Sequence, residues 1–402
     1  MNGLRSLTDY REIVGEEKVS EIYQKAGDLC DKRVLNVNST YYGGGVAATL
    51  KSLVPLLNDA GISVDWRTVR GSRDFFRVTK KFHNALQGEE INFTDMKKMV
   101  YETTNRGFSR FARIDHDLVV VHDPQPLPLI DFYEKNQPWV WRCHVDLSGP
   151  NEEVWRYLRS FVLPYNRVIY QLEEFAPRGL SKAGVAFNPA IDPLATKNEE
   201  LPEREVDSRL EKRGIDPDRC LISQISRFDK WKDPMGVLEV FKRVKENNQD
   251  CQLAMIGGIA TDDPEGQEVH RNIEREAEDM EDVHVIVDAP DIFVNAVQSR
   301  SDVVLQMSVR EGFGLAATEA LWKGTPVVAT DVGGLKTQVQ DGENGFLVEP
   351  GDYDRTVDRV LALLDRGGRE MASERVKETV KDKFLITRLM EDWIDLWREL
   401  LL

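Results

Sequence analysis

The chain has 402 residues, 41% of them hydrophobic and 30% charged, and this length predicts two globular domains that each bury a core. Its formal net charge of −16 argues against nucleic acid or an anionic membrane surface as the main partner, because both bind positively charged surfaces. The sequence contains no apolar run of ~18 residues and no signal-peptide pattern at its start, so we expect a cytoplasmic protein.

Four cysteines lie far apart in the sequence, at Cys30, Cys143, Cys220 and Cys251. They form no CxxC pair and no Cys/His set with the spacing of a zinc site. We therefore expect reduced and mostly buried thiols.

A basic and aromatic stretch interrupts the acidic composition at residues 67–81. Its basic residues are interleaved with Phe75, Phe76 and Phe82, which predicts an amphipathic helix with a solvated basic face. The same stretch leaves open a contact with an anionic substrate or with a membrane.

Apolar strands alternate with helices along the first half of the chain. Residues 34–38 are predicted to form a strand and residues 46–58 a helix, joined by a turn of Gly43, Gly44 and Gly45. Further strands are expected at residues 118–121 and 140–143, each followed by polar residues.

The second half repeats this pattern after a proline-containing segment at residues 187–203, which we interpret as a linker. One helix is predicted to begin at Pro234, with Asp233 as its N-cap. Strands are expected at residues 220–225, 253–256, 284–287, 303–307 and 326–329.

This alternation predicts an α/β fold of two Rossmann-like domains, at residues 1–186 and 204–384, facing each other across a cleft. The last helix, at residues 385–402, carries an apolar stripe at three-to-four-residue spacing and needs a surface to pack on.

The clearest candidate for a ligand site is the segment from Ser308 to Glu319, where a strand should end and a helix should start near Leu315. The backbone amides of Gly312, Phe313, Gly314 and Leu315 would then favour a phosphate at a helix N-terminus. The carboxylates of Glu311 and Glu319 suit sugar hydroxyl groups. Taken alone, the same pair also fits a dipole-stabilised helix glutamate in the first turn and a solvated loop glutamate.

A second candidate follows the strand at residues 220–225, where Arg227 and Lys232 precede the capped helix. Two cations there could hold a diphosphate and stabilise its departure. The alternative is a pair of ordinary surface cations.

The glycine turn at residues 43–45 lets backbone amides approach a phosphate, but it lacks the GxGxxG spacing of a dinucleotide site. A dehydrogenase is therefore disfavoured. Two DxD patterns, at residues 216–218 and 352–354, sit beside helix starts, where capping is favoured over a metal-bridging role.

Together, the turn at residues 43–45, the cations, the two glutamates and the loop at residues 331–334 resemble the large family of retaining glycosyltransferases with two Rossmann-like domains. The likeness covers nearly the whole chain and implies the type B glycosyltransferase architecture, with the last helix crossing back onto the first domain. It implies that Arg227 and Lys232 hold the donor diphosphate and that Glu319 binds the ribose. Glu311 and the amides of residues 312–315 would hold the transferred sugar.

Within that family, residues 122–126 and 141–148 are most similar to the trehalose synthases that join nucleotide-activated glucose to free glucose, and to the trehalose phosphorylases. This resemblance implies that His144 lies beside the transferred glucose, and that Asp123, Gln125 and Asp146 lie near the acceptor. His122 and His144 also fit hydrogen-bonded histidines at strand ends.

These features predict a metal-independent hexosyltransferase whose partners are a sugar nucleotide and a sugar acceptor. They leave open a phosphorylase, a transferase acting on a lipid-linked acceptor, and a sugar-nucleotide sensor without turnover. The donor base stays open, as does the oligomeric state, for which a homodimer is one option.

Overall fold

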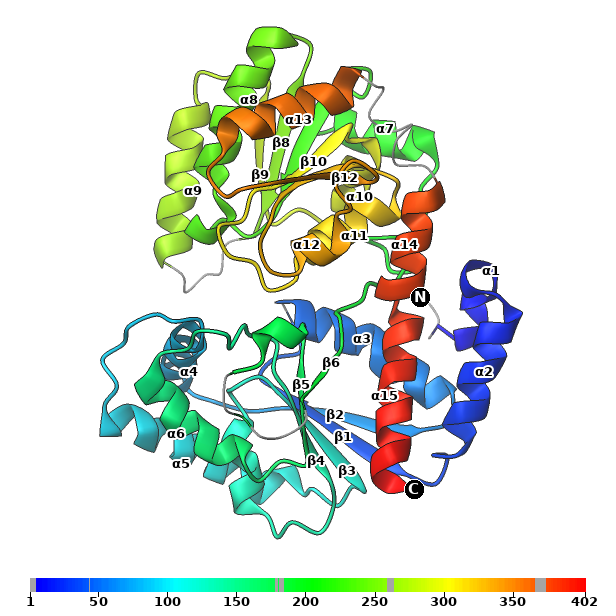
Figure 1. The fold of residues 1–402 in the computed structure, drawn as a ribbon, viewed down its shortest axis with the longest axis vertical. Coiled ribbons are helices and arrows are strands. Elements are labelled where there is room, and N and C mark those ends of the chain that lie inside the picture. The colour runs from blue at the N-terminus through cyan, green and yellow to red at the C-terminus, as the bar shows by residue number, and fades with distance from the viewer. Residues whose placement is uncertain (1–4, 43, 178–179, 181–183, 259–263, 366–373) are drawn as a thin grey trace. The chain divides into compact units, whose positions relative to one another are not determined.

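A computed structural model describes residues 5–42, 44–177, 180, 184–258, 264–365 and 374–402. Gly43 lies outside the described residues. The chain divides into two compact units, unit 1 comprising Met1–Ala190 with Ile386–Leu402 and unit 2 comprising Ile191–Leu385 (Figure 1). No described helix is long and apolar enough to cross a membrane.

Unit 1 holds a parallel six-stranded sheet in the order β2-β1-β3-β4-β5-β6. The strands are β1 (Arg33–Asn38), β2 (Ser63–Thr68), β3 (Leu118–His122), β4 (Trp139–Arg142), β5 (Arg167–Tyr170) and β6 (Gly184–Ala186). The helices are η1 (Leu7–Tyr10), α1 (Arg11–Val14), α2 (Glu16–Gly27), α3 (Gly44–Asp59), α4 (Arg73–Leu86), α5 (Asp95–Ala112), η2 (Leu127–Phe132), α6 (Glu152–Val162), η3 (Glu173–Phe175) and α15 (Ile386–Leu401).

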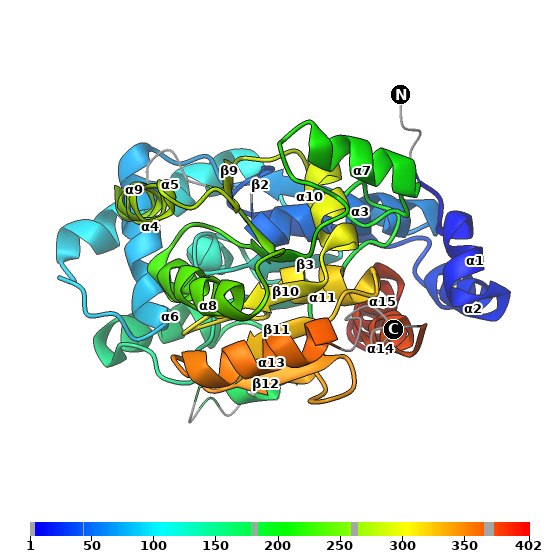
Figure 2. The same ribbon diagram turned by 90° about the horizontal axis from the view of Figure 1, so that it is seen from above.

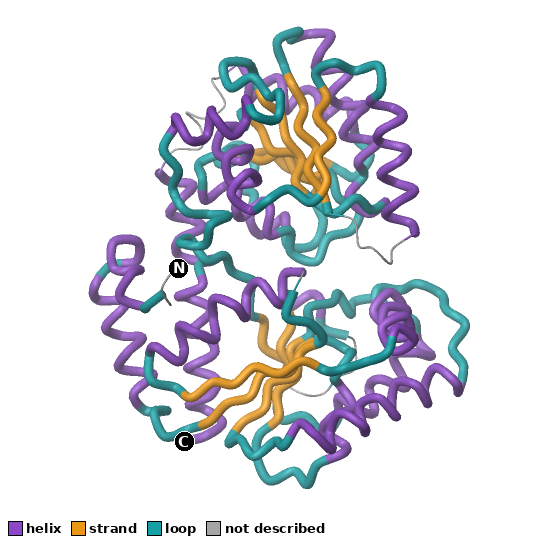
Figure 3. The backbone as a smooth tube through the Cα atoms, turned by 180° about the vertical axis from the view of Figure 1, so that it is seen from behind, coloured by secondary structure: helices purple, strands orange, loops and turns teal. Residues whose placement is uncertain are grey.

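Helices cover both faces of this sheet, as Figures 1 and 3 show. On one face, alternate strand residues such as Leu35 and Val121 pack in one core with side chains of α4, α5 and α6. On the other side α15 contacts α2 and α3, and its Trp393 and Trp397 are buried. The expectation that the last helix crosses back onto the first domain is confirmed.

Residues 73–81 of the basic stretch lie in helix α4, whereas Arg67 lies in β2 and Arg70 precedes the helix. Ser72 caps α4, because its hydroxyl accepts a hydrogen bond from Phe75 N. Phe75 and Phe82 are fully buried, whereas Phe76 is 37% exposed. The amphipathic helix predicted from the sequence is therefore present.

Unit 2 holds a second parallel sheet in the order β12-β11-β10-β7-β8-β9. Its strands are β7 (Leu221–Ile225), β8 (Gln252–Gly257), β9 (Val283–Val287), β10 (Val303–Gln306), β11 (Val327–Thr330) and β12 (Gly345–Val348). Its helices are α7 (Glu203–Glu211), η4 (Lys230–Lys232), α8 (Pro234–Asn247), α9 (Pro264–Ala277), α10 (Asp291–Arg300), α11 (Leu315–Trp322), α12 (Leu335–Gln338), α13 (Tyr353–Asp365) and α14 (Glu374–Phe384).

Two cores lie on the two faces of this sheet. One contains side chains of α8 and α13, which contact each other along one face of the sheet (Figure 2). The other contains side chains of α7 and α10. Asp233 caps α8 by accepting a hydrogen bond from Gly236 N, and Pro234 is the first helical residue, as predicted. The predicted α/β class with two Rossmann-like domains is confirmed.

Candidate active site

The strand order of unit 2 places two predicted motifs side by side. β7 and β10 are neighbours, yet the chain continues from β7 to β8 on one side and reaches β10 on the other. Ligands of open parallel sheets bind where the strand order reverses in this way, beyond the carboxyl ends of the strands. The loop after β7 carries Arg227 and Lys232, and the loop after β10 carries Glu311.

Lys232 and Glu311 form an ion pair across this switch point, with both side chains largely buried. Ser308 Oγ donates a hydrogen bond of 3.0 Å to the same carboxylate oxygen, Glu311 Oε2. The two loops are also joined through the backbone, since Val309 N donates to Trp231 O at 2.8 Å.

Arg227 belongs to the same loop but faces solvent, with 68% of its side chain exposed. Its Nη2 lies 2.9 Å from Asp229 Oδ2, and Asp229 in turn accepts a hydrogen bond from Trp231 N at 3.0 Å. Asp229 thus orients the guanidinium while leaving most of its donors available. Such a cation is suited to an anionic ligand.

The loop after β10 is shaped by close contact with the loop after β11. A Cβ added to Gly333, whose φ is +49°, would lie 1.9 Å from Glu311 O, so a side chain there would displace the loop. Gly334 N donates to Gly312 O at 3.0 Å. Phe313 is buried, and Gly314, with φ +85°, is the N-cap of α11 without a capping side chain. The first-turn amides of α11, starting at Leu315, therefore have no side-chain cap and can receive an anion.

Glu319 departs from the prediction that it lies in the first helical turn. Because α11 begins at Leu315, Glu319 is its fifth residue and is only 6% exposed. Its Oε2 lies 3.0 Å from Lys197 Nζ. Burial acts to lower the pKa of Lys197, but the charge and the hydrogen bond of Glu319 outweigh burial and raise it.

A second lysine, Lys323, contacts the backbone of α11. Lys323 Nζ donates to Glu319 O at 3.2 Å and to Gln298 Oε1 at 3.1 Å. Burial, with the charge of Lys197 adding to it, lowers the pKa of Lys323 to about 7. The carboxylate of Glu319 is thus held by Lys197, whereas Lys323 binds the backbone oxygen of the same residue.

In unit 1 the corresponding switch point lies between β1 and β3. Helix α3 begins after β1 at Gly44, whose φ is +76°, and Gly45 is its second residue. A Cβ on Gly44 would meet no atom within 4 Å, so the backbone is open there. Gly44 and Gly45 therefore belong to α3, whereas the sequence placed them in a turn before a helix at residues 46–58.

Two histidines meet at the carboxyl ends of β3 and β4. His122 Nδ1 lies 3.1 Å from His144 Nε2, and His122 Nε2 lies 3.0 Å from Asn36 Oδ1. Burial holds the pKa of His144 well below its ordinary value and lowers the pKa of His122 to about 3. Both rings are therefore neutral, and His144 can exchange hydrogen bonds with a hydroxyl group without carrying charge.

Asp123 adjoins this pair, in a left-handed backbone conformation with φ 63°. Its Oδ1 accepts a hydrogen bond of 2.9 Å from His144 N. Burial outweighs that bond and the charge of Arg142, and it raises the pKa of Asp123 to about 7. Asp123 and His144 are thus in contact at the strand ends.

Gln125 and Asp146 are less closely joined to them. Asp146 Oδ1 accepts from Ser148 N at 2.8 Å, and Gln125 Oε1 is buried without a hydrogen-bond partner. Among the described residues, neither side chain hydrogen-bonds to Asp123 or His144.

Sequence reasoning missed Lys197, Ser308 and Asp229. Lys197 lies in the segment interpreted as a linker, where no periodic pattern or motif marked it. Asp229 lies two residues from Arg227, and Ser308 lies three residues from Glu311, but these hydrogen bonds depend on loop conformations that no motif specifies.

The acidic patterns take part in local contacts. Asp352 Oδ1 accepts from Arg355 N at 3.0 Å beside the start of α13, and Asp216 Oδ1 accepts from Asp218 N at 2.9 Å. In the described part of the chain no group of three or more His, Cys, Asp or Glu side chains is arranged to hold a metal ion.

Comparisons with known proteins match both halves of the chain. Residues 36–177 match the family described as "Trehalose synthase, N-terminal domain", and residues 206–382 match "Glycosyl transferases group 1". The fold is similar to a sucrose-phosphate synthase from Thermosynechococcus elongatus, with a TM-score of 0.72 at 19% identity over 92% of this chain and 99% of that chain. The class that the fold and these matches define is a two-domain glycosyltransferase.

The chain is 45% identical to a trehalose synthase from Thermococcus litoralis, over 98% of this chain and 96% of the relative. The chain therefore belongs to the trehalose synthase family. It is also 29% identical to a trehalose phosphorylase from Pleurotus pulmonarius, over 89% of this chain but 56% of that longer protein.

Proposed function

We propose that this glycosyltransferase moves glucose from a nucleoside-diphosphate-glucose to free glucose and forms trehalose with retention of the anomeric configuration. The observation that carries this proposal is the similarity to a trehalose synthase along nearly the whole length of both proteins. Two strand-end clusters support it. The cluster of Lys232 and Glu311 in unit 2 is charged and suits a diphosphate. The cluster of His122 and His144 in unit 1 is neutral and suits sugar hydroxyl groups.

On this proposal, unit 2 binds the donor. Arg227 and Lys232 neutralise the diphosphate, the first-turn amides of α11 add hydrogen bonds to an anionic oxygen, and Glu319 accepts from the ribose hydroxyl groups. Glu311 accepts from hydroxyl groups of the transferred glucose. Since Lys232 is paired with Glu311, donor binding would give this lysine a second anionic partner.

The neutral cluster of unit 1 would bind the sugars. His144 would share a hydrogen bond with a hydroxyl of the transferred glucose, and Asp123, Gln125 and Asp146 would recognise the acceptor. Hydroxyl groups need donors and acceptors rather than charge. Since His144 Nε2 faces His122, the other nitrogen of the neutral imidazole would meet the sugar.

The chemical step breaks the bond between the anomeric carbon and the diphosphate oxygen. The acceptor oxygen forms the new glycosidic bond on the same face, and its proton passes to the departing diphosphate. Retaining glycosidases instead need two carboxyl groups about 5 Å apart. Arg227 and Lys232 lower the barrier by stabilising the charge that develops on the leaving group.

We propose that this reaction needs no metal ion, since Arg227 and Lys232 would supply the positive charge that a bridging cation would otherwise bring to the diphosphate. The local contacts of Asp216 and Asp352 support this proposal. Turnover should be unchanged in excess chelator. A loss that Mg²⁺ or Mn²⁺ restores would contradict it.

The experiment that tests the proposed function is incubation with glucose and each of ADP-, UDP- and GDP-glucose in turn. The expected products are a non-reducing disaccharide and free nucleoside diphosphate, and the preferred donor identifies the base. Consumption of a donor without disaccharide would point to another acceptor, and no consumption of any donor would contradict the proposal.

A phosphorylase is the second candidate, favoured by the similarity to a trehalose phosphorylase. The same cations would then hold inorganic phosphate. Disaccharide formed from glucose 1-phosphate, and from no nucleotide sugar, would establish this alternative.

A further inference from the structure

Two cysteine thiols are in contact at the start of the sheet in unit 2. Cys220 directly precedes β7 and Cys251 directly precedes β8, and these neighbouring parallel strands pair with Leu221 opposite Gln252. Gln252 N donates to Cys220 O at 2.8 Å, so the pairing extends to the cysteines. Their sulfur atoms lie 2.7 Å apart as free thiols.

This position suits a disulfide. Neighbouring strands are about 4.8 Å apart, which falls within the Cα separation of about 4.4–6.8 Å that disulfides span. The strands are fixed by the sheet, so little backbone movement is needed to bring the sulfur atoms into bonding distance. Cys30 and Cys143 belong to unit 1, which leaves Cys220 and Cys251 as the natural partners of each other.

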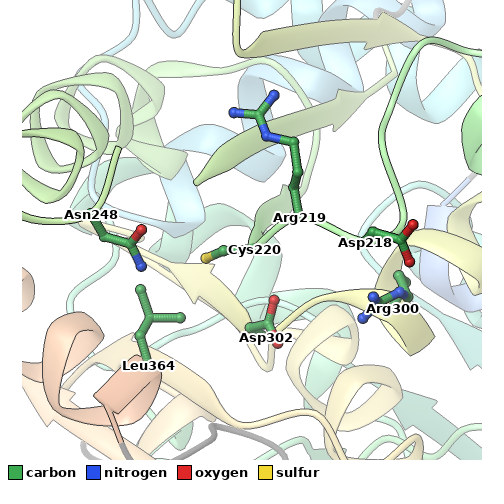
Figure 4. A pocket seen from close by; sticks show the side chains of 7 residues that line it. All are labelled: Asp218, Arg219, Cys220, Asn248, Arg300, Asp302 and Leu364. Carbon is green, nitrogen blue, oxygen red and sulfur yellow. The ribbon is translucent and has the colours of Figure 1, made fainter. Parts of the chain in front are cut away.

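One of the two thiols is reachable from solvent. Cys251 is buried, but Cys220 is half-buried and lines a pocket of about 260 Å³ (Figure 4). A water molecule takes up about 30 Å³ of liquid, so the pocket admits a small peroxide. Its other lining residues are Asp218, Arg219, Asn248, Arg300, Asp302 and Leu364.

We propose that Cys220 and Cys251 are an oxidation site that forms an intramolecular disulfide with a small peroxide as oxidant. The Cys220 thiolate attacks a peroxide oxygen and becomes a sulfenic acid, and for hydrogen peroxide the other oxygen leaves as hydroxide. The Cys251 sulfur then attacks the Cys220 sulfur, the S–S bond forms, and water leaves. The two thiols lose two electrons in total, and the peroxide gains them.

The surroundings of Cys220 make its reaction with peroxide slow, unlike that of the low-pKa cysteines that act as redox sensors. The hydrogen bond with Cys251, burial, and the nearby carboxylates of Asp302 and Asp250 all raise the pKa of Cys220. Because the thiolate is the reactive form, a raised pKa lowers the rate of attack. The disulfide is therefore a structural crosslink that accumulates over a long exposure.

The crosslink would join the two ends of a functional segment. Residues 220–251 include β7, the loop with Arg227 and Lys232, and α8. Both cysteines precede their strands, whereas Arg227 follows the end of β7. The disulfide thus restrains the unfolded chain while leaving the geometry of the loop unchanged.

The test is to treat the whole protein with hydrogen peroxide at mildly alkaline pH and to compare it with untreated protein. Mapping in denaturant should find the thiols of Cys220 and Cys251 lost together, whatever happens at the exposed Cys30. It should recover one peptide pair joined through Cys220 and Cys251, two hydrogens lighter than the separate peptides. The Tm should rise by about 5 °C and return after reduction by dithiothreitol.

The matched variants are Cys220→Ser and Cys143→Ser. Cys143→Ser should still form the crosslink, whereas Cys220→Ser should show neither the mass loss nor the Tm increase. Sulfinic or sulfonic acid at Cys220 in the wild type, or four free thiols after treatment, would overturn the proposal. These measurements do not depend on which sugar the enzyme transfers.

Discussion

The strand-end clusters of the two units use opposite electrostatics. In unit 2, Lys232 pairs with Glu311 and Arg227 with Asp229. In unit 1, His122 and His144 are neutral and linked by a hydrogen bond, and burial raises the pKa of Asp123 to about 7. One cluster is built from compensated charges, and the other from groups that burial keeps uncharged or close to it.

This difference indicates a division of labour. Paired cations favour an anion that can share them, such as a diphosphate. Neutral, buried hydrogen-bonding groups recognise sugar hydroxyl groups and gain little from charge. Variants of the charged cluster should therefore weaken nucleotide binding, and variants of the neutral cluster should impair sugar transfer.

The largest effect is expected from the cations. Arg227→Ala and Lys232→Ala should each lower kcat/KM by about 10²- to 10³-fold, because each removes a preorganised charge from the leaving group. The matched control is Lys230→Ala, since Lys230 lies in the same loop over the Trp231 ring at 5.1 Å. Turnover is measured by release of nucleoside diphosphate. Near-normal turnover in both cation variants would contradict the role of these cations in stabilising the leaving group.

The neutral cluster should give the next largest effect. His144→Ala should lower kcat/KM by roughly ten- to a hundredfold, the equivalent of about 1–3 kcal/mol for a lost buried hydrogen bond and its unpaired partner. His122→Ala should cost less, because His122 acts through His144. The rates of disaccharide formation measure both effects, and equal activity of all three proteins would contradict this role.

Lys197 should have a smaller effect, limited to the donor. Lys197→Met removes the cation beside Glu319 Oε2 and should raise the donor KM by about fivefold to tenfold. Lys197→Arg keeps the charge and should recover most of the affinity. A change in the glucose KM instead of the donor KM would show that Lys197 serves another site.

Asp123 gives a test on stability rather than on turnover. Its pKa rises from an ordinary 3.8 to about 7 on folding, so the favourable contribution of the protonated form is lost as pH rises toward and through 7. Asp123→Asn keeps the left-handed backbone and the acceptor for His144 N, but it cannot ionise. Relative to wild type, the variant should gain up to about 4 kcal/mol in unfolding free energy between pH 4 and pH 8. Denaturant titrations of the whole protein and of the variant, at both pH values, would measure this gain. The same difference in unfolding free energy between variant and wild type at both pH values would contradict it.

Much of the fold could be predicted because local signals agree with it. Alternating apolar strands, the Asp233 cap before Pro234 and the apolar stripe of the last helix each specify an element without reference to distant residues. Strand order depends on long-range pairing, so the placement of β7 beside β10 could not be read from the sequence.

The site was predictable only as a set of motifs. The sequence marked Glu311 and Lys232, but their ion pair arises from two loops that are 79 residues apart. Glu319 was expected in the first turn, yet the start of α11 at Leu315 places it one turn further, where it meets Lys197 from a segment without a motif.

The most direct test of this division of labour is calorimetric titration of the preferred nucleoside diphosphate into wild type, Arg227→Ala and His144→Ala. We predict that Arg227→Ala weakens binding by at least tenfold, whereas His144→Ala binds as tightly as wild type and yet transfers glucose slowly. Equal loss of nucleotide affinity in the two variants, or normal affinity in Arg227→Ala, would contradict the assignment of the donor to the charged cluster.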